Sequence, residues 1–558
     1  MNKLSRREML KLIGLGTVST VLAACAQATT TQPPQPTVKP TEAAQPPAAA
    51  TATQKPPEPT ATTAPTQTPP PAKVVKITLI ESWFGVPQYK ESIDPVTKAI
   101  SAKAQSEGVA IQIESMILEN HEQKYPLLYA SGADFTMAFD APWYKMDTLR
   151  TQGALSTIED LIAQYGPKLV DEITEKIYKF NLIDGHCYGI PAAYYYSGTG
   201  GVIYREDLRV KYNVPAPNSK DGWPSLEPFL EAILKNEKGM IPFGNVTTQS
   251  VVGYARPRHA WGANGPPKTG VSIPDITTGE FKFINEEEIG SEIETATLLR
   301  SWWEKGYTNK TDLTFSGSSQ NAQIDYVYPG KAASCVENEP DYKWVDQTKQ
   351  MKSSNKDAEL RGVDMTGAIA GVYKNIGQLK QWNFIVFNIN APKEQQVAGV
   401  QYYNWLASSQ DNMDLWLMGI DGTNYKKEAN LRFSEIPGVD AARNYRRMWY
   451  VSGLSGRFQR QPVDLPPEAE AALKFFSTES NWIFCPYEQF TPDIKALEQD
   501  TAKLNAVYDE AVHGINTGQV ATEDAIKSMK KMLDDNGRQT FKAKIQKQLD
   551  DYIAAHKA

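Results

Sequence analysis

Residues 74–83 read VVKITLIESW, residues 110–117 read AIQIESMI, and residues 134–143 read DFTMAFDAPW. In each stretch apolar residues alternate with polar ones, which is the period of a strand with one buried face. Helix-like stretches at about 88–105 and 119–130 lie between them. Crossovers of that length join parallel strands, so this β-α-β-α-β order predicts an α/β fold whose mainly parallel sheet is covered by helices on both faces.

Acidic and aromatic residues follow two of these predicted strands. Glu81 and Trp83 come at the end of the first, and Asp140 and Trp143 come at the end of the third. In open α/β sheets ligands bind beyond the carboxyl ends of the strands. We therefore predict that the two tryptophans offer flat ring faces and the two carboxylates accept hydrogen bonds from a ligand. The alternatives are packed tryptophans and solvated charges at the strand ends.

The N-terminus has the pattern of an export signal. Basic residues at Lys3, Arg6 and Arg7 precede an apolar run over 12–24, which is shorter than the ~20 residues that a membrane-spanning helix needs. The stretch SRREMLK at 5–11 resembles the twin-arginine export consensus, and LAAC at 22–25 resembles the bacterial lipobox. The resemblance implies that residues 1–24 are a signal peptide, and that Cys25 carries lipid, including acyl chains such as palmitate. The protein would then lie outside the cytoplasm, anchored to the membrane at the cell surface or in the periplasm.

Residues 25–72 form a predicted tether after this cysteine. Residues 26–72 contain 13 prolines and are otherwise rich in Thr and Ala, so they cannot build an apolar core. Proline favours the extended polyproline II conformation, and a stretch of this length reaches on the order of 100 Å. The tether would therefore hold a folded body at a distance from the membrane.

Composition excludes several classes of function. The net charge is −7, and it becomes about −10 once the leader is removed, which argues against nucleic-acid binding. The five His and four Cys are scattered and show no metal-ligand spacing, so neither a metal nor a cofactor is expected. After lipidation of Cys25, three cysteines remain: Cys187, Cys335 and Cys485. We expect buried thiols, and at most one disulfide, whose partners stay open.

Motifs along the rest of the chain resemble a known family. They are DGHCYGIP at 184–191, GVIYREDL at 201–208, PSLEPF at 224–229, MIPF at 240–243, and YYNWLASSQDNMDLWLMGIDG at 402–422. In their order and spacing they are similar to the extracellular solute-binding proteins of ABC importers, family 1. The last motif is similar to the LipO-like lipoprotein branch, which binds oligosaccharides. The resemblance spans about residues 73–550.

The resemblance implies a periplasmic-binding-protein-like fold, with two lobes joined by interleaved chain crossings and a hinge, and with helices at the C-terminus. We expect one lobe from 73–188 and about 365–385, the other from 189–364 and about 386–490, and a helical region at 491–558. The implied function is capture of a carbohydrate, an oligosaccharide above all, by hinge closure and its delivery to the permease subunits of an ABC importer. A monomer without enzymatic activity is expected.

The resemblance adds further ligand-binding candidates. Tyr194 and Tyr195 follow the hinge-like Gly-Ile-Pro at 189–191, and Trp261 lies where the family has a ligand-facing loop. Glu337 follows GKAASC at 330–335, which resembles a family strand that ends at the cleft, and Trp382 opens a stretch similar to the late hinge region. By contrast, Trp302, Trp303, Trp405 and Trp416 lie on helix-like stretches, where we expect them to be structural.

An enzyme is the alternative. A tethered carbohydrate lyase or glycosidase needs two carboxyl groups ~5–9.5 Å apart across the scissile bond. Glu81 and Asp140 are the pair that could supply them. Turnover of an oligosaccharide would distinguish this class from a binding protein.

Overall fold

The computed structural model describes residues 73–81, 89–118, 120–192, 200–244, 268–273, 281–310, 323–338, 340–352, 354–367, 376–377, 379–381, 383–440, 443–445 and 459–556. The chain divides into two units, Met1–Pro70 and Pro71–Ala558, and every described residue lies in the second. Cys25 and the predicted leader and tether are outside the described residues. Among the helices that the structure describes, we find none with both the length and the apolar character needed to span a membrane.

The first lobe is built on a five-stranded sheet. Its strands are β1 (Val75–Glu81), β2 (Ile111–Ile117), β3 (Met137–Asp140), β4 (Gly189–Pro191) and β11 (Phe384–Phe387), in the order β2-β1-β3-β11-β4. β1 pairs in parallel with β2 and β3, while β11 runs antiparallel to both β3 and β4. The alternating segments of the sequence therefore form the predicted parallel strands, and the later strand β11 is inserted between β3 and β4.

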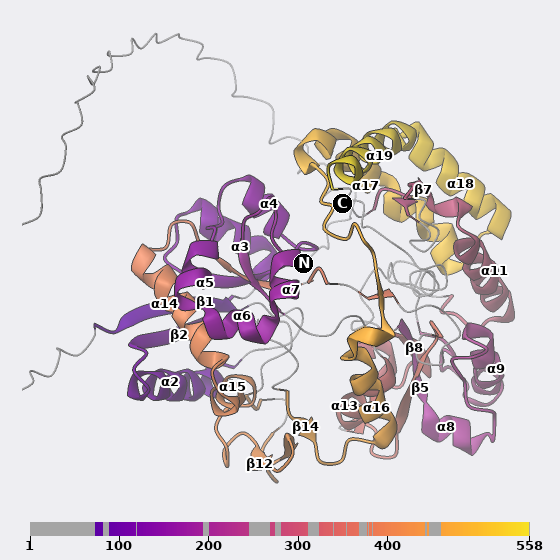
Figure 1. Cartoon of the computed structure of the whole chain (residues 1–558). Coiled ribbons are helices and arrows are strands. Elements are labelled where there is room, and N and C mark those ends of the chain that lie inside the picture. The colour runs from indigo at the N-terminus through magenta and orange to yellow at the C-terminus, as the bar shows by residue number, and fades with distance from the viewer. Residues whose placement is uncertain are drawn as a thin grey trace, which may run out of the picture. The chain divides into compact units, whose positions relative to one another are not determined.

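Helices cover both faces of this sheet, as the crossover lengths predict (Figure 1). One face, with Ile77 and Phe139, packs against α2 (Lys90–Ser106), α5 (Glu159–Tyr165), α6 (Pro167–Ile173), α14 (Lys393–Leu406) and α15 (Gln410–Leu417). The other face, with Ile80 and Ala138, packs against α3 (His121–Ala130) and α4 (Met146–Thr151). α7 (Glu175–Phe180) follows α6. β3 is thus buried on both sides, as expected of a central strand.

Helices α14 and α15 correct one predicted boundary. The predicted second lobe includes about 386–490, but Tyr402, Trp405 and Trp416 are buried in the core of the first lobe together with Ile77. The 3.6-residue period of a helix predicts which of its sides is buried, but it does not predict which sheet that side covers. The tryptophans Trp405 and Trp416 are structural, as predicted.

The second lobe contains a three-stranded antiparallel sheet. Its order is β8 (Ser334–Asn338), β5 (Gly200–Arg205) and β9 (Leu360–Asp364), with β5 paired to both neighbours. Around it lie α8 (Glu206–Lys211), η1 (Trp223–Leu226), α9 (Glu227–Asn236), η3 (Glu286–Glu288), α11 (Gly290–Lys305), the π-helical turn η4 (Gln323–Val327), α13 (Pro340–Lys352), α16 (Pro467–Phe476) and η7 (Glu479–Asn481). The chain therefore leaves the first sheet at β4, enters the second at β5, and returns to the first at β11, which are the interleaved crossings predicted for the fold.

Short strand pairs complete the described structure. They are β6 (Val271–Ser272) with β7 (Ile284–Asn285), β10 (Ile376–Gly377) with β15 (Ile483–Phe484), and β12 (Lys426–Glu428), β13 (Arg432–Ser434) and β14 (Gln461–Pro462) in one small sheet. Cys187, Cys335 and Cys485 are buried, as expected for small apolar side chains, and no disulfide joins them in the described part of the chain.

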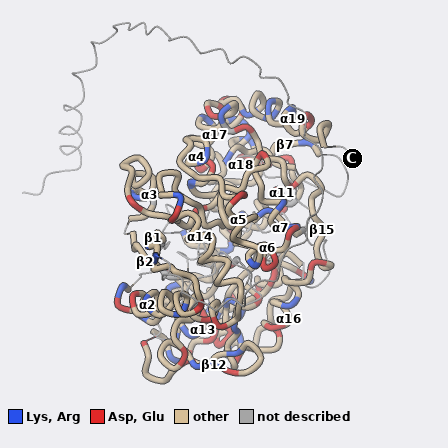
Figure 2. Tube along the Cα trace, turned by 60° about the vertical axis from the view of Figure 1, so that its left-hand side comes forward, with Lys and Arg blue, Asp and Glu red and all other residues tan. Residues whose placement is uncertain are grey.

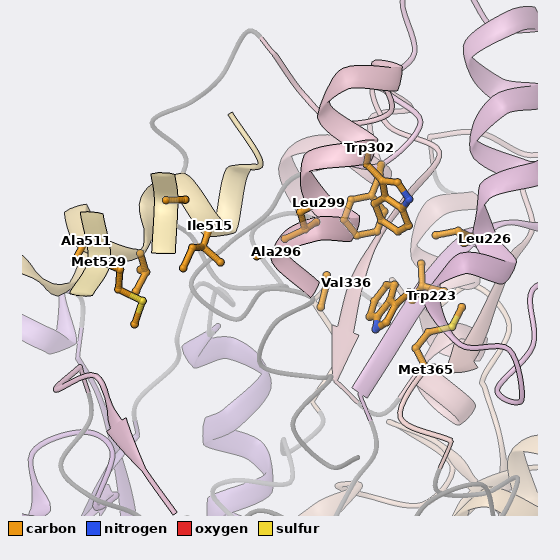
Figure 3. Close-up of a cluster of buried hydrophobic side chains, with 14 of the residues drawn as sticks. Trp223, Leu226, Ala296, Leu299, Trp302, Val336, Met365, Ala511, Ile515 and Met529 are labelled. Carbon is orange, nitrogen blue, oxygen red and sulfur yellow. The ribbon is translucent and has the colours of Figure 1, made fainter. Parts of the chain in front are cut away.

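The C-terminal helices α17 (Ile494–Thr517), α18 (Thr522–Asp535) and α19 (Arg538–Ala555) confirm the predicted helical region. They share the core of the second lobe: Figure 3 shows Ala511, Ile515 and Met529 on the side of α17 and α18 next to α11, which carries Leu299 and Trp302. Trp302 is fully buried and therefore structural, as predicted.

Charged residues of both signs alternate along these three helices (Figure 2). Some form exposed pairs one turn apart, such as Lys531 with Asp535 and Lys547 with Asp551. Such pairs place opposite charges side by side, so α17, α18 and α19 present a mixed surface and no continuous basic tract.

Candidate ligand-binding site

β1, β3 and β4 end, and β11 begins, on the same side of the first sheet. We call this side, where these strands end, the strand-end edge. β1 and β3 are parallel, so Glu81 and Asp140 end at that edge. Phe384, the first residue of β11, pairs with both Asp140 and Pro191, the last residue of β4. The segments that leave β1, β3 and β4, and the segment that enters β11, therefore meet the sheet at the same edge.

Most of the predicted ligand-binding residues belong to those segments but lie outside the described residues. They are Trp83, Tyr194, Tyr195 and Trp382, together with the side chain of Glu81. Trp261 is outside the described residues as well. Each of the first four lies within a few positions of a strand end at this edge. Their roles stay predictions, and the described part of the site consists of the turn after β3 and the start of β11.

Asp140 organises the turn after β3. Its side chain is fully buried, and Oδ1 accepts hydrogen bonds from the backbone amides of Ala141 (2.7 Å) and Lys145 (3.1 Å). Oδ2 accepts a hydrogen bond from the hydroxyl of Tyr125 (2.9 Å). Burial raises the pKa of Asp140 to about 7, although the two amides and the Tyr125 hydroxyl favour the charged form. The carboxylate that the sequence predicts to meet a ligand thus fixes the backbone that carries Trp143.

A cluster of aromatic residues on α3 supports this carboxylate. His121 stacks on Tyr125 with ring centres 4.7 Å apart, and its Nδ1 lies 2.9 Å from the hydroxyl of Tyr144. The hydroxyls of Tyr125 and Tyr129 are 3.2 Å apart. Burial lowers the pKa of His121 to about 4, so the ring is neutral at physiological pH. This cluster was not predicted, although the spacing of positions 121, 125 and 129 is that of one helix face.

Trp143 is the described aromatic residue that a ligand can reach at this edge. Its side chain is 49% exposed, and the rings of Phe139 and Tyr144 lie 6.3 and 5.9 Å from it. Its indole Nε1 donates a hydrogen bond to Oδ1 of Asn383 (3.2 Å), the residue before β11. A flat, half-exposed ring with a fixed orientation can stack on the C–H face of a sugar.

Glu337 belongs to a different group of residues. It lies in β8 of the second sheet and is 3% exposed. Its Oε2 accepts hydrogen bonds from the side-chain amides of Gln323 and Gln347, and Lys343 Nζ is 3.7 Å from Oε1. The described structure thus groups Asp140 with Trp143, whereas Glu337 contacts η4 and α13 in the other lobe.

The segment that leads into β11 is held from two sides. The backbone amides of Leu379 and Lys380 both donate to the carboxylate of Glu488 (2.9 Å each). From the first lobe, Asn181 Oδ1 accepts a hydrogen bond from Gln381 N (2.7 Å), and its Nδ2 donates to Leu379 O (2.9 Å). This chain crossing is therefore fixed next to the edge that carries Trp143.

Within the described residues, no group of three or more His, Cys, Asp or Glu side chains is arranged to hold a metal ion. The polar groups next to Trp143 include the side-chain amide of Asn383 and the phenol of the neighbouring Tyr144. Such groups suit a neutral ligand rich in hydroxyls.

Comparison with known proteins gives one sequence match and several structural ones. A family model described as "Domain of unknown function (DUF3502)" matches residues 486–554, the region of α17, α18 and α19. A search of curated protein sequences finds no match.

Three solved structures illustrate the structural similarity. The N-glycan transport solute binding protein (NgtS) from Streptococcus pneumoniae has 17% identity and a TM-score of 0.67, over 87% of this chain and 100% of that chain. The ABC-transporter substrate binding protein FusA from S. pneumoniae, in complex with kestose, has 15% identity and a TM-score of 0.55, over 87% and 100%. The HMO binding ABC-transporter associated solute binding protein from Bifidobacterium longum infantis has 13% identity and a TM-score of 0.52, over 86% and 99%.

These similarities cover 86–87% of this chain and 99–100% of each neighbour. The chain therefore has the two-lobed, periplasmic-binding-protein-like fold of the solute-binding proteins of ABC transporters, as its sequence motifs predict.

Proposed function

We propose that this protein is an extracytoplasmic solute-binding protein that captures a carbohydrate, above all an oligosaccharide, and delivers it to an ABC importer. The observation that carries the proposal is the half-exposed Trp143 at the strand-end edge of this fold, with its turn fixed by Asp140. The structural neighbours add support, since they include an N-glycan transport solute binding protein, a substrate binding protein in complex with kestose and an HMO binding protein.

The chemistry of this edge suits a neutral sugar. A sugar has C–H faces that pack on aromatic rings and a rim of hydroxyls that needs hydrogen-bonding groups. We assign ring contacts to Trp83, Trp143, Tyr194, Tyr195, Trp261 and Trp382, and hydroxyl contacts to Glu81. To Asp140 we assign support of the Trp143 turn, and to Glu337 support of η4 and α13, because protein groups already occupy both carboxylates.

We further propose that lipid on Cys25 anchors the protein to the membrane and that the 25–72 tether keeps it near its permease. The twin-arginine and lipobox motifs support this part of the proposal. Growth with a radiolabelled palmitate should label the wild-type chain, whereas Cys25→Ser should remain unlabelled and be released from membranes. Equal membrane retention of both forms would contradict lipid anchoring.

A thermal-shift screen of the full chain against mono- and oligosaccharides tests the binding function. A ligand at 100 times its Kd stabilises the folded state by ~2.7 kcal/mol, which is easily measured. Trp143→Ala should weaken the binding of the active sugar by about tenfold, since it removes a stacking surface. Trp303→Ala, on α11 in the second lobe, is the matched control and should bind as the wild type does.

Two outcomes would overturn the proposal. The first is a peptide or polyamine that stabilises the protein while no carbohydrate does. The second is product formation from an oligosaccharide that is lost in Glu81→Gln, which would identify a carbohydrate-active enzyme.

A further inference from the structure

Trp143 is unusual in combining an exposed ring with a bonded N–H group. Its side chain is 49% exposed, yet its single polar atom, Nε1, donates to Asn383 Oδ1 rather than being left to water (3.2 Å). An indole at the surface does not need a protein acceptor, because water can serve. The consequence of this bond is geometric: it fixes the rotation of the indole plane.

Asn383 is well placed to fix that plane. Its side chain is 3% exposed, and its backbone carbonyl oxygen accepts a hydrogen bond from Ala192 N (2.9 Å), just after β4. The next residue, Phe384, is paired in the sheet on both sides. One residue therefore links the turn after β3, the end of β4 and the start of β11.

The backbone before Asn383 is also held. Gln381 N is bonded to Asn181 from the first lobe, and the amides of Leu379 and Lys380 are bonded to Glu488. Asn383 thus follows a short segment with anchors on two sides. An acceptor that cannot move gives the indole a fixed direction before any ligand arrives.

We propose that Asn383 is a positioning residue of the carbohydrate site, which sets the plane of Trp143 and thereby selects sugars whose apolar face lies parallel to it. This inference rests on the proposed function. Pre-organisation raises affinity because the ring is ordered before binding and loses less conformational freedom on association. An axial hydroxyl on the stacked face would separate the sugar from the ring, so this geometry favours sugars that present a flat C–H face.

A ligand-free measurement tests the positional part. In the full chain labelled with ¹⁵N at the indole nitrogen, the 12 tryptophans give separate N–H signals, and Trp143→Phe identifies that of Trp143. Asn383→Leu should shift this signal and speed its exchange with water, whereas Asn383→Asp, which keeps an acceptor oxygen, should preserve the slow exchange. An unchanged Trp143 signal in Asn383→Leu would overturn the proposal. Asn383→Ser, whose hydroxyl is too short to reach Nε1, replaces the Leu variant if that variant does not fold.

A binding cycle tests the functional part, with the oligosaccharide that stabilises the wild type. Loss of one hydrogen bond predicts that Asn383→Leu binds about 3- to 10-fold more weakly, with a smaller loss for Asn383→Asp. In a Trp143→Phe background, Asn383→Leu should cause no further loss, because the N–H donor is already absent. Equal losses in both backgrounds would show that Asn383 does not act through Trp143.

The two measurements separate failure of this inference from failure of the proposed function. If no carbohydrate binds the wild type, both the proposed function and the proposed selection of sugars are wrong. The N–H signal of Trp143 still decides whether Asn383 orients the ring. Trp303→Phe is the control for both experiments and should change neither the Trp143 signal nor the affinity.

Discussion

The hydroxyl of Tyr125 donates a hydrogen bond to Oδ2 of Asp140 over 2.9 Å, and both side chains are withdrawn from solvent. Tyr125 comes from α3 and Asp140 from the end of β3, so the bond joins one covering helix to the edge of the sheet. Burial raises the pKa of both groups. A buried carboxyl group whose pKa is about 7 makes the stability of this edge depend on pH near neutrality.

The first prediction concerns Asp140→Asn. The pKa of Asp140 is higher in the folded state than in the unfolded chain, so the folded state holds this proton more tightly. Its contribution to the free energy of unfolding is complete below about pH 4 and is lost as pH rises to about 7, a change on the order of 4 kcal/mol. The asparagine side chain cannot titrate, so the stability of Asp140→Asn relative to the wild type should increase over this range.

The pKa of His121 shifts in the opposite direction, and its titration sets the pH range over which unfolding should be measured. Its pKa is lowered to about 4, so its contribution rises as pH increases from about 4 to 6.5. The two contributions oppose each other below pH 6.5 in the wild type, whereas only that of His121 remains in Asp140→Asn. Urea unfolding of both proteins at about pH 4.5, 6 and 8 checks this. Parallel stability curves would show that folding does not raise the pKa of Asp140.

The sequence could predict local elements and the strand ends, but not the partners of buried polar groups. The alternation at 75–81 and 111–117 predicts β1 and β2 because alternating apolar and polar residues are typical of a strand with one buried face. The same reasoning places Asp140 at a strand end, but Tyr125, its partner, is 15 residues away and is brought to it only by packing. Asn383 is 240 residues from Trp143, and no local pattern marks that pair.

The second prediction tests whether Glu488 stabilises the chain segment that leads into β11. Glu488 accepts two backbone hydrogen bonds, from Leu379 and Lys380, and burial raises its pKa. Glu488→Ala leaves two amide donors without this acceptor, so we expect a loss of about 1–3 kcal/mol in the free energy of unfolding. Glu479→Gln, in a half-exposed pair with Lys176, is the control and should unfold at the wild-type urea concentration. If both variants unfold alike, Glu488 does not hold the crossing.

The third prediction concerns a buried ion pair between the C-terminal helices and η3. The guanidinium of Arg538, fully buried at the start of α19, donates from Nη2 to Oε1 of Glu287 (2.6 Å). Glu287→Ala leaves the guanidinium with its ion pair to Asp534 on α18, and removal of one partner from a buried pair costs about 3–5 kcal/mol. The double variant Glu287→Leu/Arg538→Met should recover much of that loss because no buried charge remains. If the double variant is as unstable as Glu287→Ala, the lost stability comes from the missing ion pair and not from a charge left buried without its partner.

The last prediction compares two glycines at the ends of the C-terminal helices. Gly518 ends α17 with a φ of +69°, and Gly537 precedes α19 with a φ of +94°, so alanine is strained at both. The surroundings differ: a Cβ at position 518 would lie 2.2 Å from the carbonyl oxygen of Leu299 on α11, whereas a Cβ at 537 meets nothing within 4 Å. Gly537→Ala should therefore lower the free energy of unfolding by about 1 kcal/mol from backbone strain alone. Gly518→Ala should lower it by at least about 2 kcal/mol more, because α17 must move away from α11 and disturb the core around Trp302. Urea unfolding followed by tryptophan fluorescence measures both. Equal losses would mean that α17 does not depend on this close approach to the second lobe.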